Sequence, residues 1–153
     1  MLKFRYATDS DVELLYEWAN DPTARENSYN KESIPFEDHK KWFDKGLCSG
    51  KRSIYIFTND KGEAIGQVRI EYTSENEAII SISVDINYRK NGYAVEMLNT
   101  ACADFKVKTP GIKISAYIFK NNIASYKCFI KAGFEGYKEE VIKGIPSYIL
   151  YKI

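Results

Sequence analysis

The middle of the chain carries three successive runs with the residue pattern of β-strands, at residues 52–58, 63–73 and 77–86. An Asn-Asp-Lys-Gly stretch at residues 59–62 separates the first two runs and has the residues that a tight hairpin turn requires. In the third run isoleucine and valine alternate with serine and aspartate, so one face is apolar and the other polar. The sequence therefore predicts three consecutive antiparallel strands.

The N-terminal part of the chain has helical periodicity. Residues 9–21 place apolar side chains on one helical face, and Asp9 or Ser10 is the expected N-cap. The Asp-Pro pair at the end of this stretch should stop the helix. Residues 24–35 are polar and should form an irregular connection to the next helix.

The remaining segments extend the pattern on both sides of the β-rich centre. They are a strand at residues 2–8, a helix at 36–47, a helix that starts near Ala94 and ends before Thr109, a strand at 112–119, a short helix within 121–134 and a closing hairpin at 137–153. The order β-α-α-β-β-β-α-β-α-β-β predicts a mixed α/β (α+β) sheet. With 153 residues in all, the chain is expected to form one domain, residues 1–153.

Composition excludes several functional classes. The 22 Lys and Arg residues are balanced by 21 Asp and Glu residues, so there is no general basic charge for nucleic-acid binding. Cys48, Cys102 and Cys128 are odd in number and have no CxxC spacing, and His39 is the single histidine, so neither a disulfide framework nor a metal site is expected. Without a long apolar run or a signal peptide, we expect a cytoplasmic protein with no membrane contact.

Residues 84–94 form a corner between the third strand-like run and the next helix. The first turn of a helix has N–H groups without intrahelical partners, and the helix dipole favours negative charge there, so a phosphate can bind without a large net charge. Gly92 allows the backbone to approach a ligand closely, and Arg89 adds a cation. The GxGxxG and GxxxxGK[ST] patterns are absent. The corner alone fits either an anion site or an ordinary turn with a solvated Arg-Lys pair.

The stretch Arg-Lys-Asn-Gly-Tyr-Ala at residues 89–94 resembles the [QR]-x-x-G-x-[GA] motif of the GCN5-related N-acetyltransferase (GNAT) family. Residues 121–134, NNIASYKCFIKAGF, resemble the second motif of that family, in which Asn and then Ser or Ala precede a helix that ends in Gly-Phe. The spacing of the motifs and the order of elements extend the resemblance over essentially the whole chain. It implies a mixed, mostly antiparallel sheet of about seven strands with about four helices, splayed at its centre.

The resemblance implies that the corner holds the pyrophosphate of acetyl-CoA, the cosubstrate. A bulge in the preceding strand would splay it from its neighbour, leaving backbone groups of Val84 and Ile86 for the pantetheine arm and the acetyl carbonyl. The implied coenzyme contacts are Val84, Ile86, Arg89, Lys90, Asn91, Gly92, Tyr93, Ala94, Asn122 and Ser125.

Acetyl transfer from a thioester needs a neutral amine, a donor for the oxyanion and a proton for the departing thiolate. The resemblance gives the oxyanion role to the backbone N–H of Val84. Many relatives have a tyrosine acid where this chain has Phe129, and a phenyl ring cannot supply a proton. Ser125 is the first candidate for the acid and Tyr126 the second. For the base the candidates are Glu26, which ranks first, Glu71 and Asp85.

Specificity for the acceptor is expected in residues 18–43. The run W-x-N-D-P-x-x-R-x-x-S followed by H-x-x-W resembles the branch that acetylates nucleotide-linked amino sugars, as in pseudaminic acid biosynthesis, and overlaps the ribosomal-protein N-terminal branch. Guanidinium groups suit diphosphates, and aromatic rings suit a base or a sugar face. The candidate acceptor contacts are Arg25, Asn27, Ser28, Tyr29, His39 and Trp42. Alternatively, Trp18 and Trp42 belong to the helix core, and His39 is a hydrogen-bonded structural histidine.

The sequence thus predicts an acetyl-CoA-dependent N-acetyltransferase that acts on a small amine, a nucleotide-linked amino sugar. The alternatives are a protein N-terminal acetyltransferase and an acyl-CoA-binding module without turnover, the latter suggested by Phe129. A homodimer contact through residues 146–153 is a further possibility.

Overall fold

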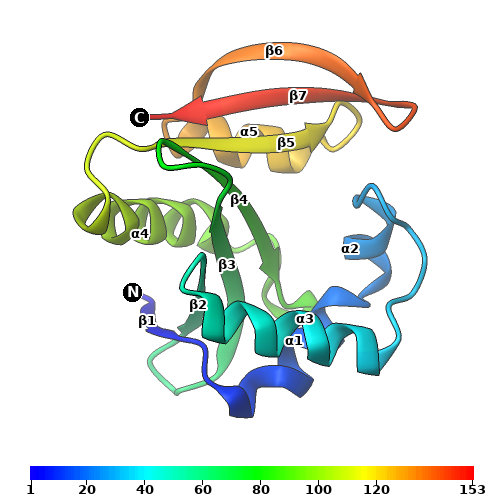
Figure 1. Ribbon diagram of the computed structural model, residues 1–153, viewed down its shortest axis with the longest axis vertical. Helices are drawn as coiled ribbons and strands as arrows, with labels where there is room; N and C mark the ends of the chain where they lie inside the picture. The colour runs from blue at the N-terminus through cyan, green and yellow to red at the C-terminus, as the bar shows by residue number, and fades with distance from the viewer.

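The computed structural model describes the backbone of residues 1–153 and every side chain except that of Tyr137. One seven-stranded sheet with the order β1-β2-β3-β4-β5-β7-β6 runs through the described chain (Figure 1). Its strands are β1 (Lys3–Tyr6), β2 (Arg52–Thr58), β3 (Ala64–Tyr72), β4 (Glu77–Val84), β5 (Lys113–Phe119), β6 (Glu135–Ile142) and β7 (Ile145–Lys152). Only β4 and β5 pair in parallel, so the predicted mixed, mostly antiparallel sheet is confirmed.

The described chain has five α-helices, one more than predicted. They are α1 (Val12–Ala19), α2 (Pro22–Glu26), α3 (Phe36–Ser49), α4 (Tyr93–Lys108) and α5 (Ile123–Lys131). The Asp-Pro pair that was expected to lead into an irregular connection instead starts α2, because the Asp21 carboxylate accepts a hydrogen bond from the Ala24 N–H at 3.1 Å and Pro22 fits the first helical position. The predicted N-cap of the first helix was also wrong, since a 3-10 turn occupies Asp9–Asp11 and Asp11 caps α1.

The sheet parts between β4 and β5. The register of β4 with β3 runs without a shift from Ala78 to Val84, whereas its register with β5 covers only Glu77, Ala78 and Ile79. Beyond Ile79 the two strands diverge, and Figure 1 shows β5, β6 and β7 as a separate wing. The implied central splay is therefore confirmed, but the implied bulge in β4 is wrong, because the opening begins where the parallel pairing ends.

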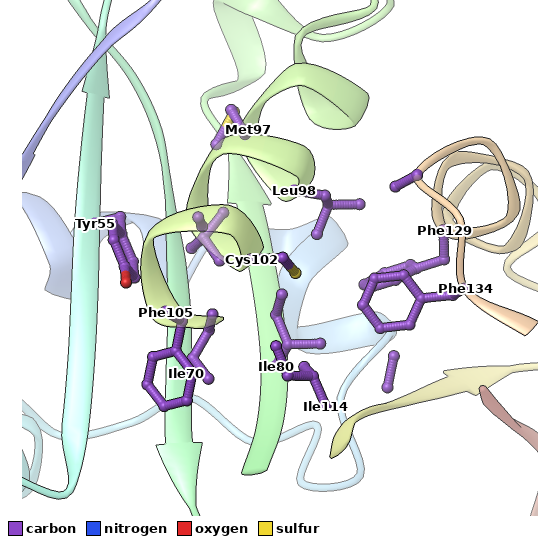
Figure 2. Close-up of a cluster of buried hydrophobic side chains, with 14 of the residues drawn as sticks. Tyr55, Ile70, Ile80, Met97, Leu98, Cys102, Phe105, Ile114, Phe129 and Phe134 are labelled. Carbon is purple, nitrogen blue, oxygen red and sulfur yellow. The ribbon is translucent and has the colours of Figure 1, made fainter. Parts of the chain in front are cut away.

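One face of the sheet packs on α4, and this contact fixes the start of that helix. Figure 2 shows side chains of α4 meeting those of the strands and of the segment around α5; the labelled residues are Tyr55, Ile70, Ile80, Met97, Leu98, Cys102, Phe105, Ile114, Phe129 and Phe134. Gly66 of β3 is required here, because a Cβ atom would lie 2.9 Å from Met97 Cε and 2.3 Å from the Ser83 carbonyl oxygen. The first turn of α4 is consequently held close to the end of β4.

The opposite face of β2 packs on α1 and α3. Leu15, Trp18 and Phe43 from the helices meet Ile54 and Ile56 from the strand, and all five side chains are buried. Trp18 therefore belongs to the helix core, which was the structural alternative given for this residue. Alternation along β2 thus lets a single strand contribute to cores on both faces of the sheet.

The C-terminal hairpin does not present residues 146–153 as an edge. β7 pairs with β5 on one side and with β6 on the other, so β6 is the outer strand of this wing. A dimer contact through residues 146–153 would need a paired strand to find a further partner, and the structure offers no support for it. Within the described chain, no helix combines the length and the apolar character needed to cross a bilayer.

Candidate active site

The corner between β4 and α4 has the backbone shape of an anion site. Gly92 caps α4 with a left-handed φ of 76°, and Lys90 two residues earlier has a φ of 65°. A Cβ atom on Gly92 would meet nothing within 4 Å, so the backbone angle and not packing selects glycine here. The first N–H groups of α4, from Tyr93 onward, are those that a helix leaves without intrahelical partners. The corner therefore fits a phosphate group in front of the helix.

Arg89 lies at this corner but is already paired. Its Nη2 donates to Asp21 Oδ2 at 2.8 Å, and its Nε donates to the Val84 carbonyl oxygen at 2.9 Å. Burial acts to raise the pKa of Asp21, but the hydrogen bonds from Arg89 and from the Ala24 N–H, with the charge of Arg89, hold that pKa below its ordinary value. Arg89 therefore clamps the end of β4 to the N-cap of α2, and its positive charge is paired with the negative charge of Asp21.

The backbone N–H of Val84 faces the opening. Asp85 donates its N–H to the Ile65 carbonyl oxygen at 2.8 Å, and in an antiparallel ladder neighbouring residues direct their N–H groups to opposite edges. The Val84 N–H is thus directed to the edge of β4 that faces β5, past the point where the parallel pairing ends. This position matches the role of an oxyanion donor. Ile86 follows in a short 3-10 turn and is largely exposed.

A cleft of about 880 Å³ lies where the two wings of the sheet part. It collects residues from α1, α2, the α2–α3 loop, α3, β2, β3, β4, β5, α5 and β6. Eight predicted site residues line it together, namely Arg25, Asn27, Ser28, Tyr29, His39, Trp42, Asn122 and Ser125. Segments separated by some 100 positions in the sequence therefore meet at one opening, although the roles of these residues stay predictions.

The structure does not bring the predicted bases into the cleft. Glu26 is exposed on α2 and is not among the cleft-lining residues. Glu71 accepts two hydrogen bonds from Arg52, at 3.1 and 3.2 Å. Asp85 accepts from the Trp18 indole N–H and from the Asn87 N–H, both at 2.9 Å. These three assignments therefore lack geometric support, because each carboxylate is either outside the cleft or already used as an acceptor.

Ser125 and Phe129 lie on the same helix, and both line the cleft. Asn122 caps α5 by accepting the Ser125 N–H at 3.4 Å, which fixes the first turn of the helix. Phe129 is buried against Phe134, with an edge-to-face ring contact at 5.0 Å, and contributes an apolar surface. Tyr126 is not among the lining residues. Of the two predicted acids, only Ser125 reaches the cleft.

Arg25 organises the loop that covers the cleft. Its guanidinium donates to the carbonyl oxygens of Ala19 at 2.7 Å, Asn30 at 2.8 Å and Glu32 at 3.3 Å, and to the Ser28 hydroxyl at 3.2 Å. Burial lowers the pKa of Arg25. Because most of its donors are engaged with neutral loop acceptors, Arg25 acts first as a brace for residues 27–34, and the predicted contact with a diphosphate would need these bonds to be shared.

Tyr29 connects this loop to the far wing of the sheet. Its hydroxyl lies 2.6 Å from the buried Ser147 Oγ of β7, and Ser147 donates onward to the Ile145 carbonyl oxygen at 3.1 Å. The Tyr29 ring also packs edge-on against Phe119 of β5, at 4.9 Å. Tyr29 therefore bridges the α2–α3 loop to β5 and β7 of the far wing.

His39 and Trp42 form part of the wall on α3. The His39 ring is 4% exposed and donates from Nε2 to the Val12 carbonyl oxygen at 3.2 Å. Burial lowers the pKa of His39, and the positive charge of Arg69 lowers it further. The hydrogen bond to Val12 acts in the opposite direction and raises this pKa. The structural alternative for His39 is therefore well supported. Trp42 carries the Arg52 guanidinium over its ring at 4.1 Å, so part of the aromatic surface expected to meet a sugar or base is already covered.

The floor of the cleft contains polar residues that the sequence analysis did not select. Gln67, Arg69, Ser81 and Ser83 all line it, and Gln67 Nε2 donates to Ser83 Oγ at 3.1 Å. The signal was present in the sequence, because polar residues at every second position of β3 and β4 must share one face of the sheet. The alternation could not tell that these half-buried side chains line a cleft between the two wings of the sheet.

The described residues contain no group of three or more His, Cys, Asp or Glu side chains placed to hold a metal ion. Cys102 lies on the buried face of α4, where burial raises the pKa of its thiol to about 11. Such a thiol is protonated near neutral pH and is a poor nucleophile. Direct transfer between two bound substrates is therefore better matched to this site than transfer through Cys102.

The fold and the site define a class, a splayed α/β sheet with a helix N-terminus at the opening. Solved structures share it. A spermidine N-acetyltransferase from Vibrio cholerae, in complex with CoA and spermine, is 16% identical with a TM-score of 0.86, covering 99% of this chain and 94% of that one. The aminoglycoside acetyltransferase AAC(6')-Ib, in complex with coenzyme A and kanamycin, is 19% identical with a TM-score of 0.81 and the same coverage.

The sequence itself matches the acetyltransferase (GNAT) domain over residues 1–135. The chain belongs to the GNAT acetyltransferase family, and the predicted N-acetyltransferase class with acetyl-CoA as cosubstrate is confirmed. A comparison with curated proteins gives no match. Neither the pseudaminic acid branch nor the ribosomal-protein branch is among the structures described above, so the branch remains a prediction.

Proposed function

We propose that this acetyltransferase acetylates the amine of a nucleotide-linked amino sugar. The observation that carries the proposal is the parting of β4 from β5 beyond Ile79, which opens one cleft between the corner and the α2–α3 loop. A donor thioester held at the β4 edge and an amine held by the loop would meet inside this cleft. Both ends of the reaction then lie on elements fixed by the sheet.

The corner would hold the coenzyme through its backbone. The N–H groups of Gly92, Tyr93 and Ala94 suit the diphosphate, since they lie where α4 begins. Lys90 is exposed beside them and adds a cation that carries none of the constraints of Arg89. The Val84 N–H suits the thioester oxygen, because it faces the gap between the strands.

Acetyl transfer requires the protein mainly to position the two substrates and to supply one proton to the departing sulfur. A C–N bond forms between the amine and the thioester carbon while the C–S bond breaks, the amine nitrogen loses a proton, and the sulfur gains one. A thiol titrates near ~8.5, so a hydroxyl donor that orients the departing sulfur is sufficient. Ser125 lines the cleft on the first turn of α5 and suits this role, whereas Phe129 one turn later cannot take it.

The acceptor end suits a ligand with hydroxyl groups and an anionic part. Asn27 and Ser28 line the cleft beside Tyr29, which supports contacts to a sugar ring. Arg25 lies on α2 directly before this loop and supports a nearby phosphate. The run from Trp18 to Trp42 that resembles the amino-sugar branch supplies nearly all of this wall, and that is the reason for preferring this acceptor to a protein N-terminus.

The experiment is an acceptor panel that follows thiol release from acetyl-CoA. It contains a UDP-linked amino sugar with a free amine, peptides with free N-termini, spermidine and kanamycin; the last two represent the structural relatives. Turnover of the UDP-linked amino sugar above the others supports the proposal. Turnover of peptides alone would replace it with the N-terminal acetyltransferase, and CoA binding without any turnover would replace it with a binding module.

A further inference from the structure

Arg69 lies on the floor of the cleft, on a strand that is paired on both of its edges. It belongs to β3, which is paired along its length with β2 and β4; its cross-strand neighbours are Ile54 and Ser81. Its guanidinium carbon lies 5.0 Å from the centre of the Trp42 ring. A cation at a central strand position is unusual, since such faces are normally covered by apolar residues.

The neighbouring carboxylate does not neutralise Arg69 by direct contact. Glu71 lies two residues along the strand, but its two oxygens are engaged by Arg52 at 3.1 and 3.2 Å. Among the described residues the ion pair of this region joins Arg52 to Glu71 and leaves Arg69 outside ion-pair distance. Arg69 therefore lines the cleft with no carboxylate of the described residues within ion-pair distance.

The cleft lining carries more positive than negative charge. Its arginines are Arg25 and Arg69, and Asp38 is the one Asp or Glu side chain among the described lining residues. Because Arg25 donates to carbonyl and hydroxyl oxygens, its charge is not neutralised by the loop. Two guanidinium groups in a partly enclosed cavity attract an anion and repel a cation.

We propose that the acceptor amine carries an anionic group, a phosphate or a carboxylate, and that Arg69 is the residue that receives it. This rests on the proposed acetylation of an amine in this cleft and adds the residue that selects the amine. The planar guanidinium can donate two parallel hydrogen bonds to either group. Gln67, Ser81 and Ser83 on the same polar floor supply further donors.

The proposal predicts that this cleft favours anionic acceptors, whereas a polyamine enzyme binds cationic ones. An acceptor with several positive charges would have to approach Arg25 and Arg69 with only Asp38 to offset them. Spermine and kanamycin, bound by the structural relatives, are ligands of that kind. This cleft should discriminate against them even though the sheet and helices superpose.

The test uses amines that are neutral apart from the amine, anionic or polycationic. Rates of thiol release are measured with glucosamine, glucosamine 6-phosphate, muramic acid, a UDP-linked amino sugar and spermidine. Wild-type protein should favour the anionic acceptors over glucosamine and spermidine by about tenfold or more in kcat/KM. Arg69→Gln should remove this preference by raising KM for the anionic acceptors, with KM for acetyl-CoA unchanged. The phosphate and carboxylate arms identify which anion is preferred.

Two control variants separate recognition from folding. Arg69→Lys keeps the charge without the planar fork and should retain part of the preference. Lys45→Gln removes one positive charge from the exposed side of α3 and should leave the preference intact. The inference is overturned if wild type uses spermidine or glucosamine as well as the anionic amines, or if Arg69→Gln lowers all acceptors by one common factor.

A binding measurement decides the matter even if no amine in the panel is acetylated. In that case the proposed function fails, and uridine diphosphate is titrated calorimetrically into CoA-loaded wild-type and Arg69→Gln protein. Binding that weakens about tenfold in the variant supports the anion-receiving role of Arg69. Equal binding to both proteins, or none to wild type, overturns it.

Discussion

The corner and the cleft are built in opposite ways. The corner uses the backbone of one contiguous segment, residues 84–94, and its key feature is a left-handed Gly92 in front of a helix. The cleft uses side chains from helices and strands of both wings and from the α2–α3 loop, joined by contacts such as that of Tyr29 with Ser147 across the parted sheet. Backbone sites tolerate many side chains, and side-chain sites do not. We therefore expect the corner to fix the cosubstrate and the cleft to fix the acceptor.

The largest effect is expected from Ser125→Ala in the cleft. Loss of a positioned proton donor lowers rates by about 100-fold or more, so kcat should fall by that order with little change in either KM. The measurement is steady-state thiol release. Tyr126→Phe is the matched variant and should stay within about twofold of wild type. Tyr126 is not among the cleft-lining residues, and its ring centre lies 4.8 Å from that of Tyr148. The opposite ranking of the two variants would reassign the acid to Tyr126.

A charge placed in the corner should act on the coenzyme alone. Gly92→Asp puts a carboxylate in the space in front of α4, and CoA should bind about tenfold more weakly or worse by calorimetry. Gly62→Asp is a close control, since Gly62 has a φ of 78° with equally open surroundings but lies in the β2–β3 hairpin. The Gly62→Asp variant should bind CoA as tightly as wild type, although its melting temperature should fall by about as much as that of the Gly92→Asp variant. Equal affinity in the Gly92 variant would refute the assignment of the corner.

The wall of the cleft should make stability depend on pH through His39. Because burial holds the pKa of His39 below its ordinary 6.5, the unfolded chain takes up a proton first as the pH falls. The contribution to stability is thus complete above pH 6.5 and is lost as the pH falls toward the lower pKa of the folded state. Urea unfolding between pH 5 and pH 7.5 measures this, and the slope should flatten in His39→Phe. A wild-type stability that rises on acidification would contradict it.

The smallest effect is expected at Glu26. This residue was the first candidate for the base, but it is exposed on α2 outside the lining of the cleft. Glu26→Gln should leave kcat and both KM values within about twofold of wild type, because a solvent-facing carboxylate contributes little at a distance. Steady-state assays over pH 6–9 would show this. A pH-dependent loss of kcat in the variant would restore Glu26 as the base and would bring α2 into the catalytic site.

Much of the fold followed from local patterns. The three strands of the centre, the hairpin at residues 59–62 and the helix from residue 36 were predicted close to their observed bounds, because period and turn residues act over a few positions. The corner was found in the same way. The error at Asp21-Pro22 has a local cause too, since the same two residues can end one helix or cap the next.

The site was predicted only in part. The candidate acceptor contacts do meet in one cleft, whereas their roles stay predictions. The sequence could not show that Arg25 is engaged by loop carbonyls or that Asp85 is held by Trp18, since both contacts depend on how distant segments pack. It also passed over Arg69, whose importance depends on which face of β3 is left uncovered.

The amino-acid sequence alone determined the strands, four of the five helices of the described chain and the corner between β4 and α4, because backbone hydrogen bonding and side-chain periodicity are set by near neighbours. Tertiary structure decided the acceptor cleft. β4 and β5 stay paired for three residues and then part, and that divergence sets which side chains from α1, α3, β3 and α5 face one another. Such an arrangement depends on long-range packing, which no short stretch of sequence contains.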